Sequence, residues 1–407
     1  MDDTQTANRI RVLFVDDEPM LLQGLKRMLR GQRDVWDMDF VSSAGAALDY
    51  MQQTSVDVVV SDMRMPEMDG AALLDEVSRR HPEAIRLVLS GYAENEAVLK
   101  TIGPSHQYLA KPCDAEVLIS TVQRSLKLRQ RLSSPELLAF VTGLTALPSA
   151  PAIYQDFIAT VGKWHATSES ISDIIERDVG LTTTILKLTN SAYFSLPMKI
   201  LNCRQAIQLL GLDTIRSLVA AASLFRAFEG SSVQAAILNA MCDDALALAA
   251  LARKIAEAEG FPSDEADRAC CAGLLAHVGI LMFLVSDAAS YYRVIKSVQK
   301  GDASTLEAER AAFGASHVEA GAYLLALWGF ADPIVEAVLH HHNPLAAETG
   351  AFDLIGAVHV AEALLPPRFG AGESGLDQTY IDTFGKGANV AAWRDMGARL
   401  LQKGAPL

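Results

Sequence analysis

The sequence predicts a doubly wound α/β domain over roughly its first third and an all-α domain over the remainder. Between residues 9 and 127, five short apolar runs alternate with segments of helical periodicity. This alternation is typical of a parallel sheet with helices on both faces. Beyond about residue 140 the strand pattern stops, and apolar residues recur at the spacing of one helix face. Ala-rich stretches such as 245–252 suit close packing between helices.

Each apolar run of the first domain has the length of a strand, and each is followed by a segment of helical spacing. The expected strands are 11–15, 38–41, 56–61, 84–90 and 106–110. The expected helices are 18–30, 43–53, 70–80, 94–102 and one that begins near Asp114. Right-handed connections between parallel strands place all five carboxyl ends on one edge of the sheet.

Polar residues gather at these strand ends. Asp16 and Asp17 follow the first strand, Asp62 the third, Ser90 ends the fourth and Lys111 follows the fifth. Three carboxylates in one crevice repel each other unless a cation lies among them, and oxygen ligands suit Mg²⁺. Lys111 and Ser90 are suited to bind phosphoryl oxygens. In-line attack by Asp62 on phosphorus needs positioning and charge neutralisation, and this set supplies both.

The ordered set of motifs resembles the receiver domain of bacterial two-component response regulators. The resemblance covers residues 9–127. It is carried by Asp16-Asp17, the segment SDMRMPEMDG at 61–70, Ser90-Gly91 and Lys111-Pro112. The ordered set is specific, although each element alone would be a weak signal.

The resemblance implies a role for each site residue. Asp62 would be the phosphoacceptor, and Asp17 and Asp62 would bind Mg²⁺ directly. Asp16 would act on the ion through water, and the Arg64 carbonyl would complete the protein ligands. Lys111 would contact the phosphoryl group.

Ser90 and Tyr108 would form the switch pair of such a domain, in which the hydroxyl moves toward the phosphoryl group and the aromatic ring turns inward. An aromatic residue in an edge strand also packs against its neighbours without switching. The role of Tyr108 therefore stays open between these two interpretations.

A linking helix is expected over residues 114–136, because few helix breakers occur there. Ser134 and Pro135 have the residue types of a helix cap and first turn, which indicates a stop and restart at the end of this segment.

The second half resembles the HDOD family, an output domain related to the metal-dependent HD phosphohydrolases. The match covers most of residues 137–345, and residues 346–407 are expected to form a C-terminal helical extension. The resemblance rests on segments 173–194, 206–218, 272–283 and 309–330 and on the His340-His341 pair.

The second half departs from the HD pattern at the residues that hydrolysis needs. HD enzymes hold metal with a histidine, an adjacent His-Asp pair and a distal aspartate. The pair position reads Ala276-His277, segment 239–250 contains no histidine, and the distal position offers His359 and Glu362. The resemblance therefore implies the fold without the chemistry, and we expect no enzyme activity.

One alternative is left open by the remaining metal-binding residue types. His277, His317, His340 and Glu362 could still hold a metal ion. The second half would then be a metal-dependent phosphohydrolase that acts on a signalling nucleotide.

The amino-acid composition argues against several classes of partner and cellular location. The net charge of −14 argues against nucleic acid and against an acidic membrane surface. We expect no apolar run to reach the 18 or more residues of a membrane span, and the N-terminus does not have the pattern of a signal peptide. The five cysteines form no CxxC pair and suit the reducing cytoplasm.

We therefore expect a cytoplasmic response regulator of a two-component phosphorelay. A sensor histidine kinase would phosphorylate Asp62 with Mg²⁺, and the HDOD domain would bind a downstream protein. A homodimer is left open.

Overall fold

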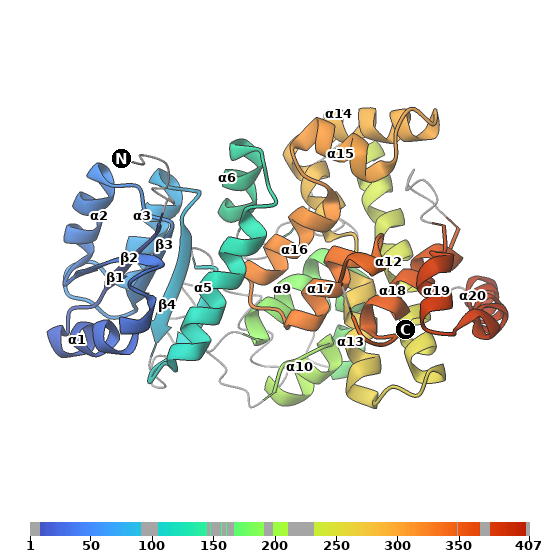
Figure 1. Ribbon diagram of the computed structural model, residues 1–407, viewed down its shortest axis with the longest axis horizontal. Helices are drawn as coiled ribbons and strands as arrows, with labels where there is room; N and C mark the ends of the chain where they lie inside the picture. The colour runs from blue at the N-terminus through green and yellow to red at the C-terminus, as the bar shows by residue number, and fades with distance from the viewer. Residues whose placement is uncertain are drawn as a thin grey trace, which may run out of the picture.

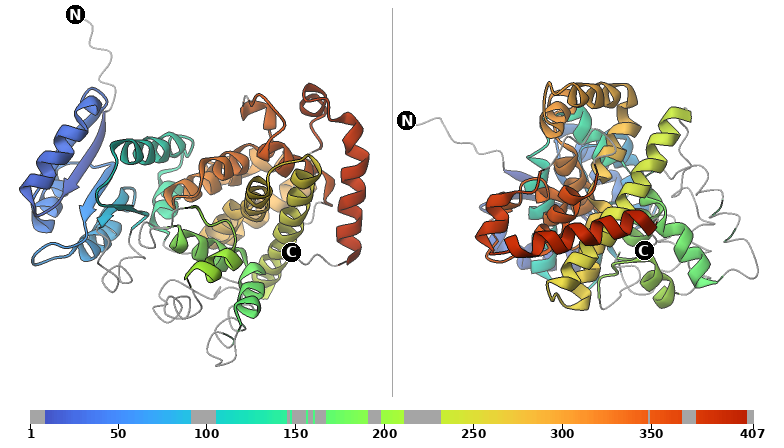
Figure 2. Two further views of the ribbon diagram at one scale, coloured as in Figure 1. Left: turned by 90° about the horizontal axis from the view of Figure 1, so that it is seen from below. Right: turned by 90° about the vertical axis from the view of Figure 1, so that its right-hand side faces the viewer.

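The computed structural model describes most of both expected domains (Figure 1). The described residues are 9–90, 105–144, 147, 156, 160, 167–190, 198–210, 232–347, 349–366 and 375–403. The helix expected at 94–102 lies outside them. Figure 2 shows the α/β domain at one end of the long axis and helix α20 (Val390–Lys403) at the other.

The α/β domain contains one parallel sheet in the strand order β2-β1-β3-β4-β5. Its strands are β1 (Ile10–Val15), β2 (Trp36–Val41), β3 (Val58–Asp62), β4 (Ile85–Ser90) and β5 (Gln107–Ala110). Its described helices are α1 (Pro19–Met28), η1 (Arg30–Gln32), α2 (Ala44–Gln53), α3 (Gly70–Arg80) and α5 (Ala115–Arg129). The predicted fold class of this domain is confirmed.

The two central strands explain why the sheet forms here. Residues 12–15 and 58–60 are at most 1% exposed, so their continuous apolar runs are buried on both faces. Side-chain caps fix the helix starts that follow. Ser43 accepts from the Ala46 N–H at 3.2 Å, and Asp69 accepts from the Ala72 N–H at 2.8 Å.

The segment between the domains bends at the stop and restart predicted at Ser134-Pro135, although the linking helix expected over 114–136 ends earlier than predicted. Helix α5 ends at Arg129 and helix α6 (Pro135–Gly143) restarts after the expected cap, where Ser134 Oγ accepts from the Leu137 N–H at 3.1 Å. The Ser133 backbone N–H and hydroxyl both donate to the Gly314 carbonyl, at 3.1 and 2.6 Å. This contact with a distant residue pins the bend to the helical domain.

The second half is all-helical in its described residues, as predicted. Its helices after α6 are α8 (Ser168–Glu176), α9 (Val179–Thr189), α10 (Cys203–Leu210), α12 (Ser232–Ala258), α13 (Ser263–Leu275), α14 (Val278–Gln299), α15 (Thr305–Phe313), α16 (His317–Leu327), α17 (Asp332–His340), η2 (Pro344–Ala347), α18 (Leu354–Leu364), α19 (Gln378–Thr383), η3 (Gly387–Asn389) and α20.

The C-terminal helices belong to the core of this domain. Helix α18 packs against α12, α13 and α17. Trp393 of α20 is 1% exposed, and its ring stacks on Phe352 with centroids 5.5 Å apart. The segment expected as an extension therefore completes the domain's packing.

One helical stretch changes an expectation about span length. Ser263–Gln299, which comprises α13 and α14, is long and apolar enough to cross a membrane by length and composition. Of its most apolar window, 78% is buried inside the protein, as in a core helix. The expectation that no segment reaches this length is thus corrected.

Candidate functional site

The acidic residues meet where the strand order reverses between β1 and β3. Asp16 follows β1 and is 2% exposed, and Asp62 ends β3 and is 8% exposed. Lys111, which follows β5, lies 2.8 Å from Asp16 Oδ2 through its Nζ and also forms an ion pair with Asp62 Oδ1. The carboxyl ends of parallel strands at such a reversal form a ligand crevice. The structure thus brings these three side chains together as the sequence suggested.

For the other expected site residues, the structure describes only part of the expected arrangement. Asp17 is half-buried beside Asp16. The Arg64 side chain is exposed, while its backbone N–H donates to Asp62 Oδ2 at 2.9 Å and so orients the carboxylate. Ser90 ends β4, but its side chain and Gly91 lie outside the described residues. The catalytic and ligand roles of these residues stay predictions.

The loop after Asp62 requires glycine at its end. A Cβ on Gly70 would lie 2.1 Å from the Asp62 carbonyl oxygen. The Gly70 N–H donates to the Met63 carbonyl at 2.9 Å, which closes the loop over the strand end. Only glycine allows this approach.

Charge in the crevice is partly balanced by one lysine. Burial raises the pKa of Asp62, although its hydrogen bond and ion pair with Lys111 act in the opposite direction. Burial lowers the pKa of Lys111, but the hydrogen bonds to Asp16 and Asp62 outweigh it and the net pKa is raised. An oxygen-only donor set with surplus negative charge fits Mg²⁺, which Asp16, Asp17 and Asp62 would hold.

A second cluster of chemically active side chains lies in the helical domain. We call it the histidine cluster. One ring nitrogen of each member lies within 4.8 Å of those of the others. Its members are His277, His317, His341 and His342.

The cluster corrects the set expected from the sequence. His277, His317 and Glu362 do lie together, with Glu362 Oε2 at 3.4 Å from His277 Nε2. His340 points elsewhere, because its Nε2 lies 3.3 Å from Glu336 Oε2 one turn earlier on α17. The helix ends at His340, and the following turn directs the next two histidines into the cluster.

His359, at the expected distal position, has a structural role instead. Its Nδ1 contacts the His341 carbonyl oxygen at 2.7 Å, and its Nε2 accepts from the Asp377 N–H at 2.9 Å. One ring nitrogen therefore holds the backbone just after α17, and the other holds the backbone at the start of α19.

Comparison with known families agrees with both halves of the chain. Residues 12–123 match the family model described as response regulator receiver domain, and residues 147–344 match the model described as HDOD domain. The chain is a receiver domain joined to an HDOD domain.

Curated relatives share part of the chain. The hydrogenase transcriptional regulatory protein HoxA of Cupriavidus necator is 36% identical over 129 residues, which are 31% of this chain and 25% of HoxA. The DNA-binding transcriptional regulator NtrC of Klebsiella pneumoniae is 29% identical over 161 residues, 39% of this chain and 34% of NtrC. The sensor kinase CckA of Brucella abortus is 34% identical over 128 residues, 30% of this chain and 13% of CckA. The matched segments thus span about a third or less of the length of these relatives.

Solved structures include separate receivers and a longer regulator. The signal receiver domain of an HD domain-containing protein from Pseudomonas fluorescens Pf-5 is 30% identical, with 29% of this chain and 95% of that chain covered and a TM-score of 0.28. The MmoQ response regulator from Methylococcus capsulatus is 23% identical, with 61% and 98% covered and a TM-score of 0.45.

The receiver and the HDOD domain are joined by a buried polar network that the sequence did not suggest. Arg86 of β4 is 0% exposed and donates to the Thr142 carbonyl of α6 at 2.7 Å. His106 Nε2 lies 2.6 Å from the same oxygen. Burial lowers the pKa of His106, and the charge of Arg86 lowers it further. His106 is therefore neutral, and the receiver side supplies the positive charge through Arg86.

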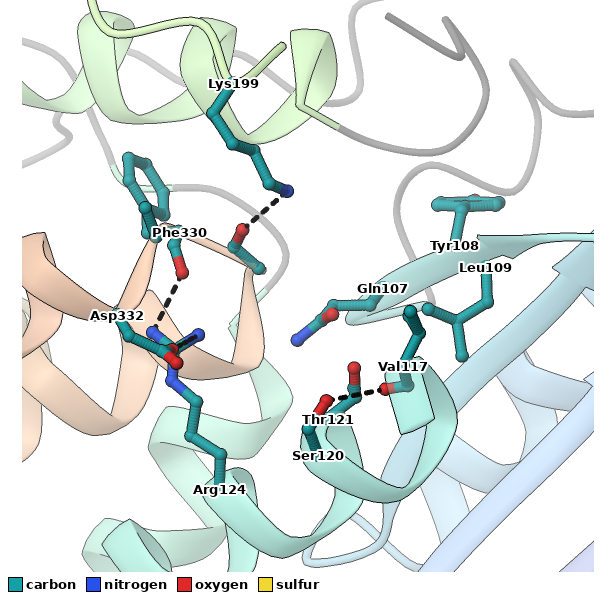
Figure 3. Close-up of a pocket in the computed structure, with 12 residues that line it drawn as sticks. Gln107, Tyr108, Leu109, Val117, Ser120, Thr121, Arg124, Lys199, Phe330 and Asp332 are labelled. Carbon is teal, nitrogen blue, oxygen red and sulfur yellow. Dashed lines mark hydrogen bonds and ion pairs between the residues drawn. The ribbon is translucent and has the colours of Figure 1, made fainter. Parts of the chain in front are cut away.

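A crevice beside this network separates β5 and α5 from the start of α17 (Figure 3). It encloses about 430 Å³, and Tyr108, itself 6% exposed, lines it. Gln107 Nε2 donates to the Ala326 carbonyl at 2.7 Å. Arg124 Nη2 donates to the Phe330 carbonyl at 2.8 Å, and Arg124 forms an ion pair with Asp332. The last strand and helix of the receiver thus rest directly on the HDOD domain.

Proposed function

We propose that this chain is a cytoplasmic response regulator whose HDOD domain binds a downstream protein according to the phosphorylation state of Asp62. A sensor histidine kinase supplies the phosphoryl group. The convergence of Asp62, Asp16 and Lys111 in one crevice of a receiver domain is the observation that carries the proposal.

The transfer uses groups already in place. An Asp62 oxygen attacks the phosphorus of a phosphohistidine, a P–O bond forms, and the P–N bond breaks. Its electron pair stays on the imidazole nitrogen, which takes up a proton. Asp16, Asp17, Asp62 and the Arg64 carbonyl would hold Mg²⁺, which when bound would neutralise developing negative charge. The Arg64 N–H fixes one Asp62 oxygen, and Lys111 lies beside the other.

Lys111 supports a route from the crevice to the HDOD domain. It follows β5 directly, and Gln107 at the other end of this four-residue strand bonds the Ala326 carbonyl. Phosphorylation replaces the single carboxylate charge of Asp62 with nearly two negative charges on the phosphoryl oxygens, which draw Lys111 toward them. The strand then shifts and carries Gln107 and Tyr108 with it, which changes the contact with α16 and α17.

The HDOD domain acts by binding rather than by catalysis in this proposal. The pair position holds Ala276-His277, so the carboxylate that bridges metal ions and water in HD enzymes is absent from it. The competing function is a metal-dependent phosphohydrolase of a signalling nucleotide, and the histidine cluster favours it. Hydrolysis of a cyclic nucleotide by the full chain, lost in His317→Ala, would establish that alternative.

Phosphorylation of the full chain tests the proposal. Acetyl phosphate with Mg²⁺ should add one hydroxylamine-labile phosphoryl group, measured as a mass increase. Asp62→Asn should lower the labelling at least about a hundredfold, because the nucleophile is lost. Glu67→Gln, an exposed acid in the same loop, is the matched control and should label as the wild type does.

Hydrogen exchange tests the coupling separately. Phosphorylation should change protection at residues 107–110 and 326–332 together. Labelling of Asp62→Asn at the wild-type level would refute the site. Unchanged protection in fully labelled protein would refute the coupling and leave the site intact.

A further inference from the structure

We propose that the histidine cluster binds one divalent transition-metal ion of the zinc and iron class, and that this ion holds the HDOD helices together. The proposal is independent of phosphorylation at Asp62. It rests on the spacing of four imidazole rings from three parts of the chain, on the hydrogen bonds that orient them, and on the carboxylates beside them.

The spacing of the ring nitrogens is close to that of a coordination sphere. His317 Nε2 and His342 Nε2 lie 3.2 Å apart, and all four candidate nitrogens lie within 4.8 Å of one another. Nitrogen ligands at about 2.1 Å from a tetrahedral zinc ion lie about 3.4 Å apart. The tightest pair already has this spacing, and the widest closes with a shift of roughly 1.4 Å.

Hydrogen bonds on the far side of two rings direct lone pairs inward. His317 Nδ1 lies 2.7 Å from Glu309 Oε2, and a proton on this nitrogen leaves Nε2 as an acceptor. His341 Nδ1 lies 2.9 Å from the Val338 carbonyl oxygen, which likewise requires the proton on Nδ1. A ring that donates one nitrogen to a carboxylate or carbonyl and offers the other is the usual arrangement of a metal-binding histidine.

One of these inward nitrogens has no protein partner among the described residues. His341 Nε2 is buried and makes no hydrogen bond within this part of the chain. A proton on His342 Nε2 can bridge to His317 Nε2, but it does nothing for His341. Leaving a buried polar atom unpaired costs about 1–3 kcal/mol, whereas a metal ion accepts all four lone pairs at once.

The two carboxylates beside the histidine cluster need a positively charged partner. Glu309 is 0% exposed, and Glu362 lies against His277 with 12% of its side chain exposed. Among the described residues, the ion pairs of these two acids are with histidines and none is with lysine or arginine. A divalent cation held by neutral imidazoles balances both charges, and Glu362 can serve as a fifth ligand.

Backbone packing holds the rings at this distance. A Cβ on Gly279 would lie 2.1 Å from the His317 carbonyl oxygen, so the starts of α14 and α16 touch. Glu309 is held in turn by the Tyr291 hydroxyl at 3.1 Å and the His317 N–H at 2.8 Å. Nitrogen-rich ligation of this kind selects zinc, iron, cobalt or nickel and excludes Mg²⁺.

Metal analysis of the purified full chain is the test. Wild-type protein should carry about one equivalent of a transition metal after desalting, or take it up when zinc or cobalt is supplied. His341→Ala should lower the content at least about tenfold. The adjacent His340→Ala is the matched control and should keep the metal, because His340 contacts Glu336 instead.

Two further variants separate ligation from folding. Glu309→Gln leaves every proposed ligand in place and should weaken metal affinity about 10–100-fold, the usual effect of losing a carboxylate behind a ligand histidine. Cobalt in the wild-type protein should give the visible absorption of a nitrogen-bound ion, and His342→Gln should alter it while the circular dichroism stays native. Wild-type protein that takes up no stoichiometric metal, or a cobalt spectrum unchanged in His342→Gln, would overturn the proposal.

Discussion

The acidic crevice of the receiver and the histidine cluster of the HDOD domain are built by opposite means. The crevice places oxygen donors at the ends of parallel strands, where the side chain of Asp62 is 11% exposed and that of Lys111 is 23% exposed. The cluster places nitrogen donors at helix ends, and His317 and His341 are 0% exposed. A residue that exchanges a group with another protein must be reachable, whereas an ion that braces helices need not be. The difference supports the two proposals, signalling for the first site and stabilisation for the second.

Substitution of two glycines should have the largest effects, and each substitution should damage only one of the two sites. A Cβ would lie 2.1 Å from a carbonyl oxygen at each, that of Asp62 for Gly70 and that of His317 for Gly279. Alanine at either position should cost about 2–4 kcal/mol in its own domain, because backbone must move. Gly70→Ala should slow phosphorylation at least about tenfold and keep the metal content. Gly279→Ala should do the reverse.

Gly45→Ala is the control for both glycine variants. Gly45 lies in α2, and no atom lies within 4 Å of the added Cβ. This change should leave both readouts unchanged and raise stability by up to about 1 kcal/mol, because alanine favours the helix. Loss of phosphorylation and metal together in both clash variants would show that the two sites are not independent.

A smaller effect concerns the loss of folding stability caused by the ionised carboxylate of Asp62 in the crevice. Burial raises the pKa of Asp62 above its ordinary value of 3.8, so the folded receiver prefers the protonated acid. Folding stability therefore falls as pH rises from about 3.8 through the raised pKa, and the full cost is present at neutral pH. Asp62→Asn resembles the protonated acid and should be more stable than wild type by up to about 1 kcal/mol at pH 7.

Denaturant unfolding at several pH values measures this effect. The advantage of Asp62→Asn should vanish near pH 4 and below, and Mg²⁺ should stabilise the wild type more than the variant. Glu67→Gln is exposed and should show neither trend. An Asp62→Asn protein less stable than wild type at neutral pH would contradict the proposed charge balance.

The crevice could be predicted from the sequence because it depends on local sequence patterns and on a general rule for the connections between strands. Apolar runs locate the strands, and right-handed connections bring Asp16, Asp62 and Lys111 to one edge. The choice among three consecutive histidines at 340–342 could not be made in this way. Successive residues on a helix point about 100° apart, so a shift of one residue in the end of α17 changes which rings face inward.

The joint between the domains was also set by distant contacts. The residue types of Ser134 and Pro135 indicated a restart, but the bend depends on Gly314, which lies far along the chain. Arg86 follows an apolar residue in β4 and gives no sequence signal of burial. It is buried because α6 covers it and the Thr142 carbonyl accepts a hydrogen bond from its Nη2.

The surface that connects the two sites includes the residue with the smallest expected effect, Asp332, beside Arg124, whose effect is larger. Arg124→Ala removes a hydrogen bond to the Phe330 carbonyl and an ion pair with Asp332, and should weaken docking by about 1–2 kcal/mol. Asp332→Asn should cost less than about 0.5 kcal/mol, because 71% of this side chain is exposed and its pairing is screened by solvent. Lys127→Ala, an exposed cation on the same helix, is the control. Hydrogen exchange at residues 107–110 should rise most in Arg124→Ala, while phosphorylation and metal content stay at wild-type levels. If the phosphorylation level or the metal content changes instead, the docking surface belongs to one of the two sites. It would then not be a connection between two separate sites.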